Sequence, residues 1–145
     1  MDLPDLNVWL ALSARAHPHH AAARHYWEHQ AADAVLFCTV TAIGLVRLLC
    51  QPRVMGAQTL STAEASQVLQ DLLAQPGVQL ATEAGSSWDL FHHLLNSHAL
   101  PSRLCTDAHL AALAIAGGWR LVSFDSDFQR FANCSRLHLS PCASA

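Results

Sequence analysis

The sequence predicts an α/β protein with a mainly parallel sheet that is covered by helices on both faces. Three observations lead to this prediction. Short apolar runs alternate with longer helical patterns along the chain, which is typical of β-α-β units. The composition, with 52% hydrophobic and 13% charged residues, is that of a folded globular protein. The length of 145 residues suits one domain, and we expect a single domain over residues 1–145.

The first half of the chain predicts two strands and three helices. The apolar start of the chain runs into Asp5, and a second brief apolar run is bounded by polar residues, as is typical of strands. Pro18 stands where a helix can begin, and the third helical pattern ends before Pro52. We expect strands at residues 1–3 and 34–38, and helices at residues 6–12, 18–30 and 41–50.

The second half predicts three helices and three strands. Ser61 and Glu64 have the spacing of a capping box, so a helix begins there and ends before Pro76. A later helix ends at Gly117 and Gly118, because glycine readily caps a helix C-terminus. We expect helices at residues 62–75, 86–97 and 106–116, strands at residues 78–81 and 120–124, and an edge strand at residues 136–139.

Four aspartates lie where a parallel sheet places functional residues, at the carboxyl ends of its strands. Asp5 follows the first predicted strand, and Asp125 and Asp127 follow the strand at residues 120–124. Asp107 lies in the first turn of a helix, on the same face as an apolar stripe, where an uncompensated carboxylate is costly. Each aspartate alone also fits a structural role, as a helix cap or a turn residue.

Together these carboxylates predict a site for a hard divalent cation such as Mg²⁺ or Mn²⁺, which prefers several converging oxygen ligands. A cation held there can make hydroxide available and stabilise charge on a phosphate oxygen. The net charge of −3 means that the protein has no overall positive field to attract nucleic acid. A bound cation would neutralise much of this negative charge. All eight basic residues are arginine, the better bidentate phosphate ligand, although codon bias in a GC-rich genome is the simpler explanation.

The ordered set of motifs resembles the PIN-domain family, and within it the VapC-type toxins of bacterial toxin–antitoxin pairs. Residues 5–7 match the D-x-N start of the family, and residues 17–27 look like its second helix. Residues 106–112 match the T-D-A-x-L-A-A segment, and residues 121–128 match the ending in which acids follow a strand. The resemblance covers nearly the whole chain, in the expected order.

The resemblance implies an α/β/α sandwich, an endoribonuclease that depends on Mg²⁺ or Mn²⁺, frequent homodimers, and inhibition by a small VapB-type antitoxin. It makes Asp5, Asp107 and Asp125 the catalytic, metal-binding acids. It also makes Asn7 and Thr106 supporting residues that orient these acids, with Asp127 as an outer member of the site.

One position departs from the family pattern. The family usually carries a glutamate early in the third helix, and here that position falls on or near Ala42, with no acid between Asp33 and Glu64. The loss removes one oxygen ligand and leaves room for Arg47 to face the substrate groove. Arg47 and Arg103 are therefore our candidates for RNA contact, although Arg47 also fits a solvated surface position.

Two other functions remain open at this point. The missing glutamate favours a degenerate PIN module that binds RNA or a protein partner without cleavage, and another metal-dependent phosphohydrolase fits the same type of sheet. The N-terminus lacks a signal-peptide pattern and no apolar run is long enough to span a membrane, so we expect a cytoplasmic protein. The five cysteines have no metal-binding or disulfide pattern and are expected to be buried, reduced thiols.

Overall fold

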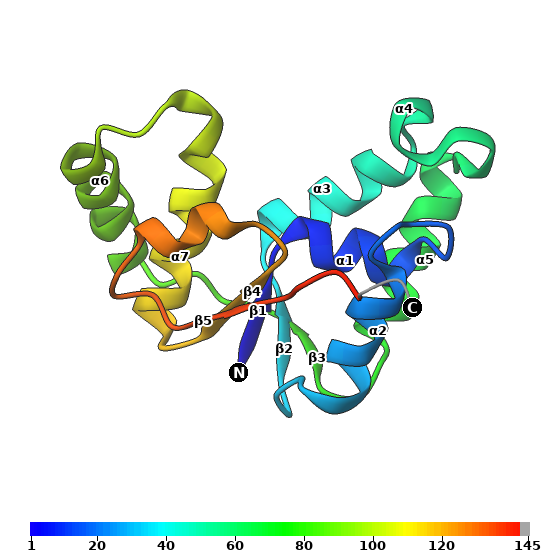
Figure 1. The fold of residues 1–145 in the computed structure, drawn as a ribbon, viewed down its shortest axis with the longest axis horizontal. Helices are drawn as coiled ribbons and strands as arrows, with labels where there is room; N and C mark the ends of the chain where they lie inside the picture. Colours follow the sequence, from blue (N-terminus) through cyan, green and yellow to red (C-terminus); the bar gives the residue numbers. More distant parts are fainter. Residues whose placement is uncertain (143–145) are drawn as a thin grey trace.

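A computed structural model describes residues 1–142; the last three residues of the expected domain lie outside this range. Its centre is a five-stranded sheet in the order β3-β2-β1-β4-β5, and each neighbouring pair of strands is parallel (Figure 1). This confirms the predicted fold class. The strands are short and cover β1 Asp2–Pro4, β2 Val35–Phe37, β3 Val78–Leu80, β4 Arg120–Ser123 and β5 Arg136–His138.

Helices connect the strands, and every predicted helix is present. They are α1 Leu6–Ser13, α2 His20–His29, α3 Thr39–Leu49, α4 Pro52–Met55, α5 Thr62–Leu73, α6 Ser86–His98 and α7 Cys105–Gly117. Three short 3₁₀ helices accompany them: η1 Gly56–Gln58, η2 Ser102–Leu104 and η3 Ser126–Arg130. The one-turn helix α4 and the 3₁₀ helices were not predicted, because segments this short carry no periodic pattern.

Capping residues explain why α3 begins at a different residue than predicted and why α7 ends where predicted. Helix α3 begins two residues earlier than expected, because Cys38 acts as its N-cap and the Thr41 hydroxyl accepts a hydrogen bond from the Cys38 backbone N–H at 3.0 Å. Cysteine is not a usual capping residue, so a helix start at Cys38 was not predicted. Helix α7 ends as predicted, since Gly118 takes the left-handed conformation (φ 65°) that favours glycine.

The sheet separates two helical layers (Figure 1). Alternate residues of β2 face opposite sides: Leu36 packs in a core with helices α6 and α7, whereas Val35 and Phe37 pack in a core with helices α1, α3 and α5. On the second side, the rings of Trp9 and Phe37 stack at 3.7 Å. Both faces of the sheet are therefore covered, which is the α/β/α arrangement that the family resemblance implied.

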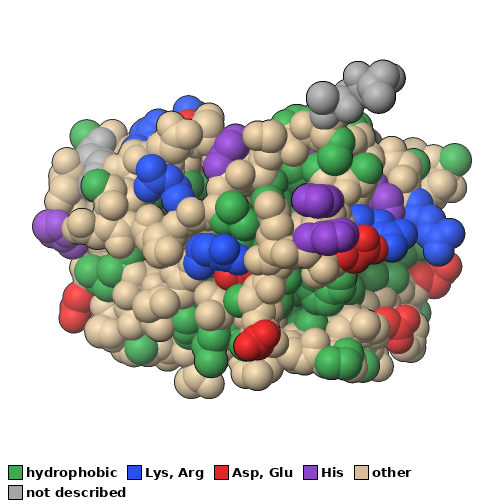
Figure 2. Space-filling model, turned by 60° about the horizontal axis from the view of Figure 1, so that its bottom comes forward, with side chains coloured by type: hydrophobic (Ala, Val, Ile, Leu, Met, Phe, Trp, Pro, Cys, Tyr) green, Lys and Arg blue, Asp and Glu red, His purple; other side chains and the backbone are tan. Residues whose placement is uncertain are grey.

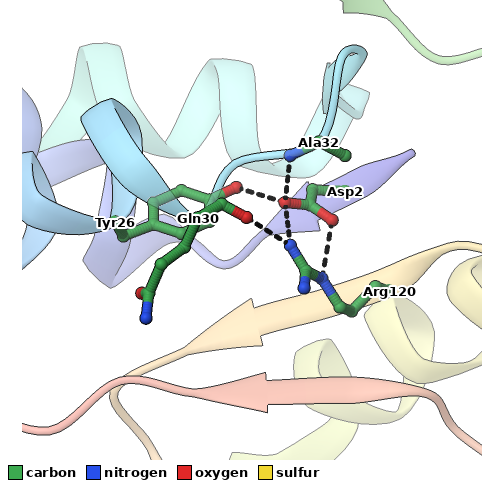
Figure 3. A network of polar contacts seen from close by, with 5 residues as sticks. All are labelled: Asp2, Tyr26, Gln30, Ala32 and Arg120. Atoms are coloured by element: carbon green, nitrogen blue, oxygen red, sulfur yellow. Dashed lines mark hydrogen bonds and ion pairs between the residues drawn. The ribbon is translucent and has the colours of Figure 1, made fainter.

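The amino ends of β1 and β4 are tied together by a buried carboxylate (Figure 3). Asp2 is 1% exposed and accepts two hydrogen bonds from the Arg120 guanidinium, each at 2.8 Å. The Tyr26 hydroxyl and the Ala32 backbone N–H also donate to Asp2, at 2.7 Å and 3.0 Å. Arg120 donates a further bond to the Gln30 carbonyl at 2.8 Å. This network connects the two central strands to the end of α2.

Figure 2 shows the face of the molecule turned forward from the bottom of Figure 1, where acidic side chains of the described residues are scattered singly and only some adjoin arginine or histidine. Two of the five free thiols, Cys105 and Cys142, are exposed, so the expectation of buried cysteines is wrong for them.

No helix among the described residues has the length and apolar character needed to cross a bilayer.

Candidate metal centre

The strand order creates a switch point at the carboxyl ends of β1 and β4. From β1 the chain continues to β2 on one side, whereas β4 continues to β5 on the other, and crevices between such strands are where α/β proteins bind ligands. Pro4 is paired with Val122, and the Asp5 backbone N–H donates to the Val122 carbonyl at 2.8 Å. This register sets Asp5 beside the end of β4, from which the chain continues to Asp125.

Helix α7 brings the third predicted acid to the same edge. Asp107 lies half-buried in its first turn, and the expected apolar face behind it is buried through Leu110, Ala111 and Ala114. One carboxylate oxygen each from Asp107, Asp125 and Asp127 lies within 4.8 Å of the others. The tight group therefore contains Asp127, which we had expected as an outer member.

Asp5 lies next to this group, with both of its oxygens engaged. One oxygen accepts the Leu6 backbone N–H at 2.7 Å, because Asp5 is also the N-cap of α1. The other accepts the Ser123 hydroxyl at 2.9 Å. Burial, only partly offset by these hydrogen bonds, raises the pKa of Asp5, and the charge of Asp125 raises it further.

Burial and the neighbouring negative charges together shift the pKa of Asp107. Burial first, and then the negative charges of Asp5, Asp125 and Asp127, raise the pKa of Asp107 from its ordinary 3.8 to about 6, against the opposing effect of Arg103. Converging carboxylate oxygens whose negative charge is only partly balanced by arginine fit a hard divalent cation, which would supply further positive charge.

Ser123 is the residue that sequence analysis missed. It is 2% exposed at the end of β4, and its hydroxyl donates to Asp5. The same oxygen accepts from the Asn7 amide at 3.1 Å and from the Asp125 backbone N–H at 2.9 Å. One hydroxyl thus contacts three parts of the site. The sequence signal was slight: a small polar residue at the last position of a strand, just before the acids.

The predicted supporting residues differ in what they contact. Asn7 contacts Ser123 rather than an acid, so it acts on the site through that hydroxyl. The Asp127 backbone N–H donates to Asp125 at 2.8 Å, and its carboxylate lies 3.3 Å from Arg103 and 3.6 Å from Arg130. Within residues 1–142, the exposed Thr106 makes no hydrogen bond to the acids; it lines a neighbouring cavity.

The two predicted RNA-contacting arginines lie in different places. Arg103, on η2, is 67% exposed and touches the acidic group through Asp127. Arg47 is exposed near the end of α3, where it lines a shallow hollow with Val46, Cys50 and residues of α4 and the start of α5. None of the clustered aspartates lines that hollow. The structure brings Arg103, but not Arg47, into contact with the acids.

We expect Ser123→Ala to weaken divalent-ion binding by roughly 10- to 100-fold, because Asp5 and Asn7 lose the hydroxyl that orients them. Titration calorimetry with Mn²⁺ measures the change, and Ser140→Ala, at an exposed serine, is the matched control. Equal Mn²⁺ affinity in the two variants would show that the hydroxyl only supports the fold.

Comparison with known proteins gives a consistent result. Residues 3–133 match the family described as PIN domain. Ribonuclease VapC33 of Mycobacterium tuberculosis is 33% identical over 135 residues, which cover 92% of this chain and 94% of that protein. Ribonuclease VapC44 of the same species is 36% identical over 146 aligned residues, which cover 95% of this chain and 96% of that protein.

Solved structures share the fold at low sequence identity. Mycobacterium tuberculosis VapC20, described as a sarcin–ricin loop cleaving toxin, superposes with a TM-score of 0.69 at 17% identity and covers 91% of this chain and 95% of its own. VapBC2 from Rickettsia felis, bound to a DNA fragment from their promoter, gives a TM-score of 0.68 at 12% identity, with coverage of 96% and 98%.

Proposed function

Because the chain belongs to the PIN-domain family, and to the VapC ribonucleases within it, we propose that it is a metal-dependent endoribonuclease and the toxin of a VapBC-type toxin–antitoxin pair. The observation that carries this proposal is the convergence of Asp107, Asp125 and Asp127 within 4.8 Å, with Asp5 beside them. Because all donors of this acidic group are carboxylates, the group favours Mg²⁺ or Mn²⁺ over softer ions.

Some residues of the site would hold the cation, and others orient the residues that hold it. Asp107 and Asp125, with Asp5 and Asp127, would hold the cation, which when bound activates a water molecule and stabilises charge on the phosphate. Ser123 fixes one oxygen of Asp5 by donating to it, and Asn7 in turn holds Ser123. The first turn of α7 presents Asp107 at a helix N-terminus, whose dipole favours negative charge.

Arg103 is the better candidate for contact with the RNA backbone. In the free protein its guanidinium pairs with Asp127 at 3.3 Å, and both groups are exposed enough for the pair to be weak. With the acids holding a cation, Asp127 would bind Arg103 less strongly, and Arg103 would be free to move to a phosphate oxygen. Arg47 would contact only RNA that extends toward α4. Thr106 remains a supporting residue in this proposal, acting through its neighbour Asp107.

The proposal extends to partners and location. A VapB-type antitoxin as the inhibitor is supported by relatives solved as VapBC complexes, from Rickettsia felis and from nontypeable Haemophilus influenzae. We further propose a cytoplasmic homodimer organised as one PIN domain over residues 1–145, in keeping with the family.

A second candidate function rests on one observation. The family's third-helix glutamate is replaced at Ala42, which is buried at 7% exposure, so α3 offers no carboxylate to the site. The loss of this glutamate favours an alternative function, in which the protein is a PIN module that binds RNA without cleaving it.

Removing the metal distinguishes the two functions. We expect purified protein to cleave single-stranded RNA with Mg²⁺ or Mn²⁺, to lose that activity in EDTA, and to regain it when Mn²⁺ is restored, because the carboxylates cannot activate water alone. Gel analysis of end-labelled RNA measures cleavage. RNA that is bound but never cut, under any ion condition, would support the binding module instead.

A further inference from the structure

A shallow cavity beside the metal centre, widely open to solvent, has no role in the function proposed so far. It has a volume of about 400 Å³, and its lining includes Val40 from α3, Glu83 after β3, Trp88 and Phe91 from α6, and Thr106 and His109 from α7. We refer to it as the Glu83 cavity. We propose that the Glu83 cavity binds one unpaired guanine base of the RNA next to the cleaved phosphate. The proposal rests on the ribonuclease activity proposed above.

The location of the cavity fits a base adjacent to the reacting phosphate. Thr106, in its wall, is the residue directly before Asp107 in the first turn of α7. The cavity and the acidic group therefore lie on neighbouring sides of one helix turn. An RNA strand with a phosphate at Asp107 has a base close to this opening, and sequence-specific proteins bind unstacked bases in such pockets.

The walls offer apolar and aromatic surface of the kind that bases pack against. Trp88 is 50% exposed and Val40 is 37% exposed, although both are large apolar side chains. The Trp88 ring lies edge-to-face with Phe91 at 5.5 Å and tilted against His109 at 5.6 Å, so three rings gather at this wall while Trp88 stays half exposed. Stacking of a base on an aromatic ring contributes substantially to single-strand binding.

Two polar groups of the cavity, Glu83 and His109 Nε2, make no hydrogen bond to the described residues. The Glu83 carboxylate is 26% exposed and accepts no hydrogen bond from the described residues. His109 Nε2 lies 3.8 Å from it, within ion-pairing distance if the imidazole is protonated but too far for a hydrogen bond, and it is buried without a hydrogen-bond partner. A half-buried carboxylate in apolar surroundings is costly unless donors reach it, so a ligand that brings donors is favoured.

Guanine supplies those donors best among the four RNA bases. Its Watson–Crick edge presents two adjacent donors, N1–H and the N2 amino group, which match the two oxygens of a carboxylate. Adenine and cytosine present one amino donor beside an acceptor, and uracil flanks its one donor with two carbonyls. His109 is a positioning residue here, because a small rotation of Glu83 toward Nε2 would fix the carboxylate within the cavity.

Inosine, which lacks the N2 amino group, provides an atomic test. Binding is measured by fluorescence anisotropy on the Asp107→Asn protein, so that cleavage does not intervene, with a short uridine oligonucleotide that carries a single guanosine or a single inosine. We expect inosine to weaken binding by about tenfold. In the Asp107→Asn, Glu83→Gln protein this difference should shrink to about twofold or less, whereas Asp89→Asn, at an exposed acid on the same helix, should leave it unchanged.

A second measurement separates this proposal from the ribonuclease itself. Ends of a random RNA pool cleaved by the wild type should be enriched in guanine at one position beside the cut; Glu83→Gln should remove this enrichment, and the control Asp89→Asn should keep it. Cleavage without guanine enrichment, together with equal binding of guanosine and inosine, would overturn the proposal and leave the ribonuclease standing. A Glu83→Gln protein that loses affinity only for a VapB-type antitoxin would also overturn it, by assigning the cavity to a protein side chain.

Discussion

Asp107→Asn is expected to lower the rate of RNA cleavage by at least ~100-fold without loss of the fold. The substitution removes a carboxylate oxygen from the tight acidic group, and loss of a direct ligand should exceed the 10- to 100-fold effect typical of residues behind the ligands. Initial cleavage rates at saturating Mn²⁺ measure the change. Asp71→Asn, at an exposed acid on α5, is the matched control.

The same substitution should make the metal-free protein more stable at neutral pH. The pKa of Asp107 is raised to about 6 in the folded protein, against an ordinary value of 3.8 in the unfolded chain. Between these values the folded state binds more protons, so stability falls as the pH rises through that range, and the ionised Asp107 is a net cost at pH 7. We therefore expect the Tm of Asp107→Asn to exceed that of the wild type at pH 7 in EDTA, but not at pH 4.

Two results together would contradict the role of Asp107. One is cleavage at the wild-type rate by Asp107→Asn. The other is an equal Tm for variant and wild type at pH 7, with and without Mn²⁺, since a ligand that binds only the folded state must raise its Tm. An inactive variant with a raised metal-free Tm and no response to Mn²⁺ is the expected combination, because the acids are held together at a cost that the cation offsets.

Asp2→Asn is expected to reduce the free energy of unfolding by about 3 kcal/mol. Removing one partner of a buried ion pair typically costs about 3–5 kcal/mol, and the lower end applies because the Arg120 side chain remains 35% exposed. Urea unfolding followed by circular dichroism measures the loss. Tyr26→Phe, which removes one of the donors to Asp2, should cost only about 1 kcal/mol.

The contribution of Asp2 should also depend on pH in a defined direction. Burial alone would raise the pKa of Asp2, but hydrogen bonds from Arg120, Ala32 and Tyr26 outweigh it, so the pKa lies below its ordinary value of 3.8. A lowered pKa means that the stabilisation is present at neutral pH and is lost as the pH falls through the folded-state value. If Asp2→Asn cost no more than Tyr26→Phe at pH 7, the ion pair would not be what holds β1 to β4.

Much of the architecture could be predicted from the sequence because its signals are local. Alternation of short apolar runs with helical patterns predicted a parallel sheet with helices on both faces, and all five strands and every predicted helix are present. The rule that parallel strands present functional residues at their carboxyl ends drew attention to Asp5, Asp107 and Asp125 before their positions were known. The signals that set these elements, such as the Ser61–Glu64 cap and Gly118, act within one turn of the chain.

The tertiary structure decided how those residues are combined. Asp127 joins Asp107 and Asp125 because the first turn of η3 folds back on Asp125, and Ser123 joins Asp5 because β1 and β4 pair in one register. Asp2 and Arg120 are 118 positions apart and meet through the same pairing. Trp88 reaches the vicinity of Asp107 through the packing of α6 on α7, and Glu83 reaches it from the segment that joins β3 to α6. Contacts between distant segments depend on register and packing, which the sequence of either segment does not encode by itself.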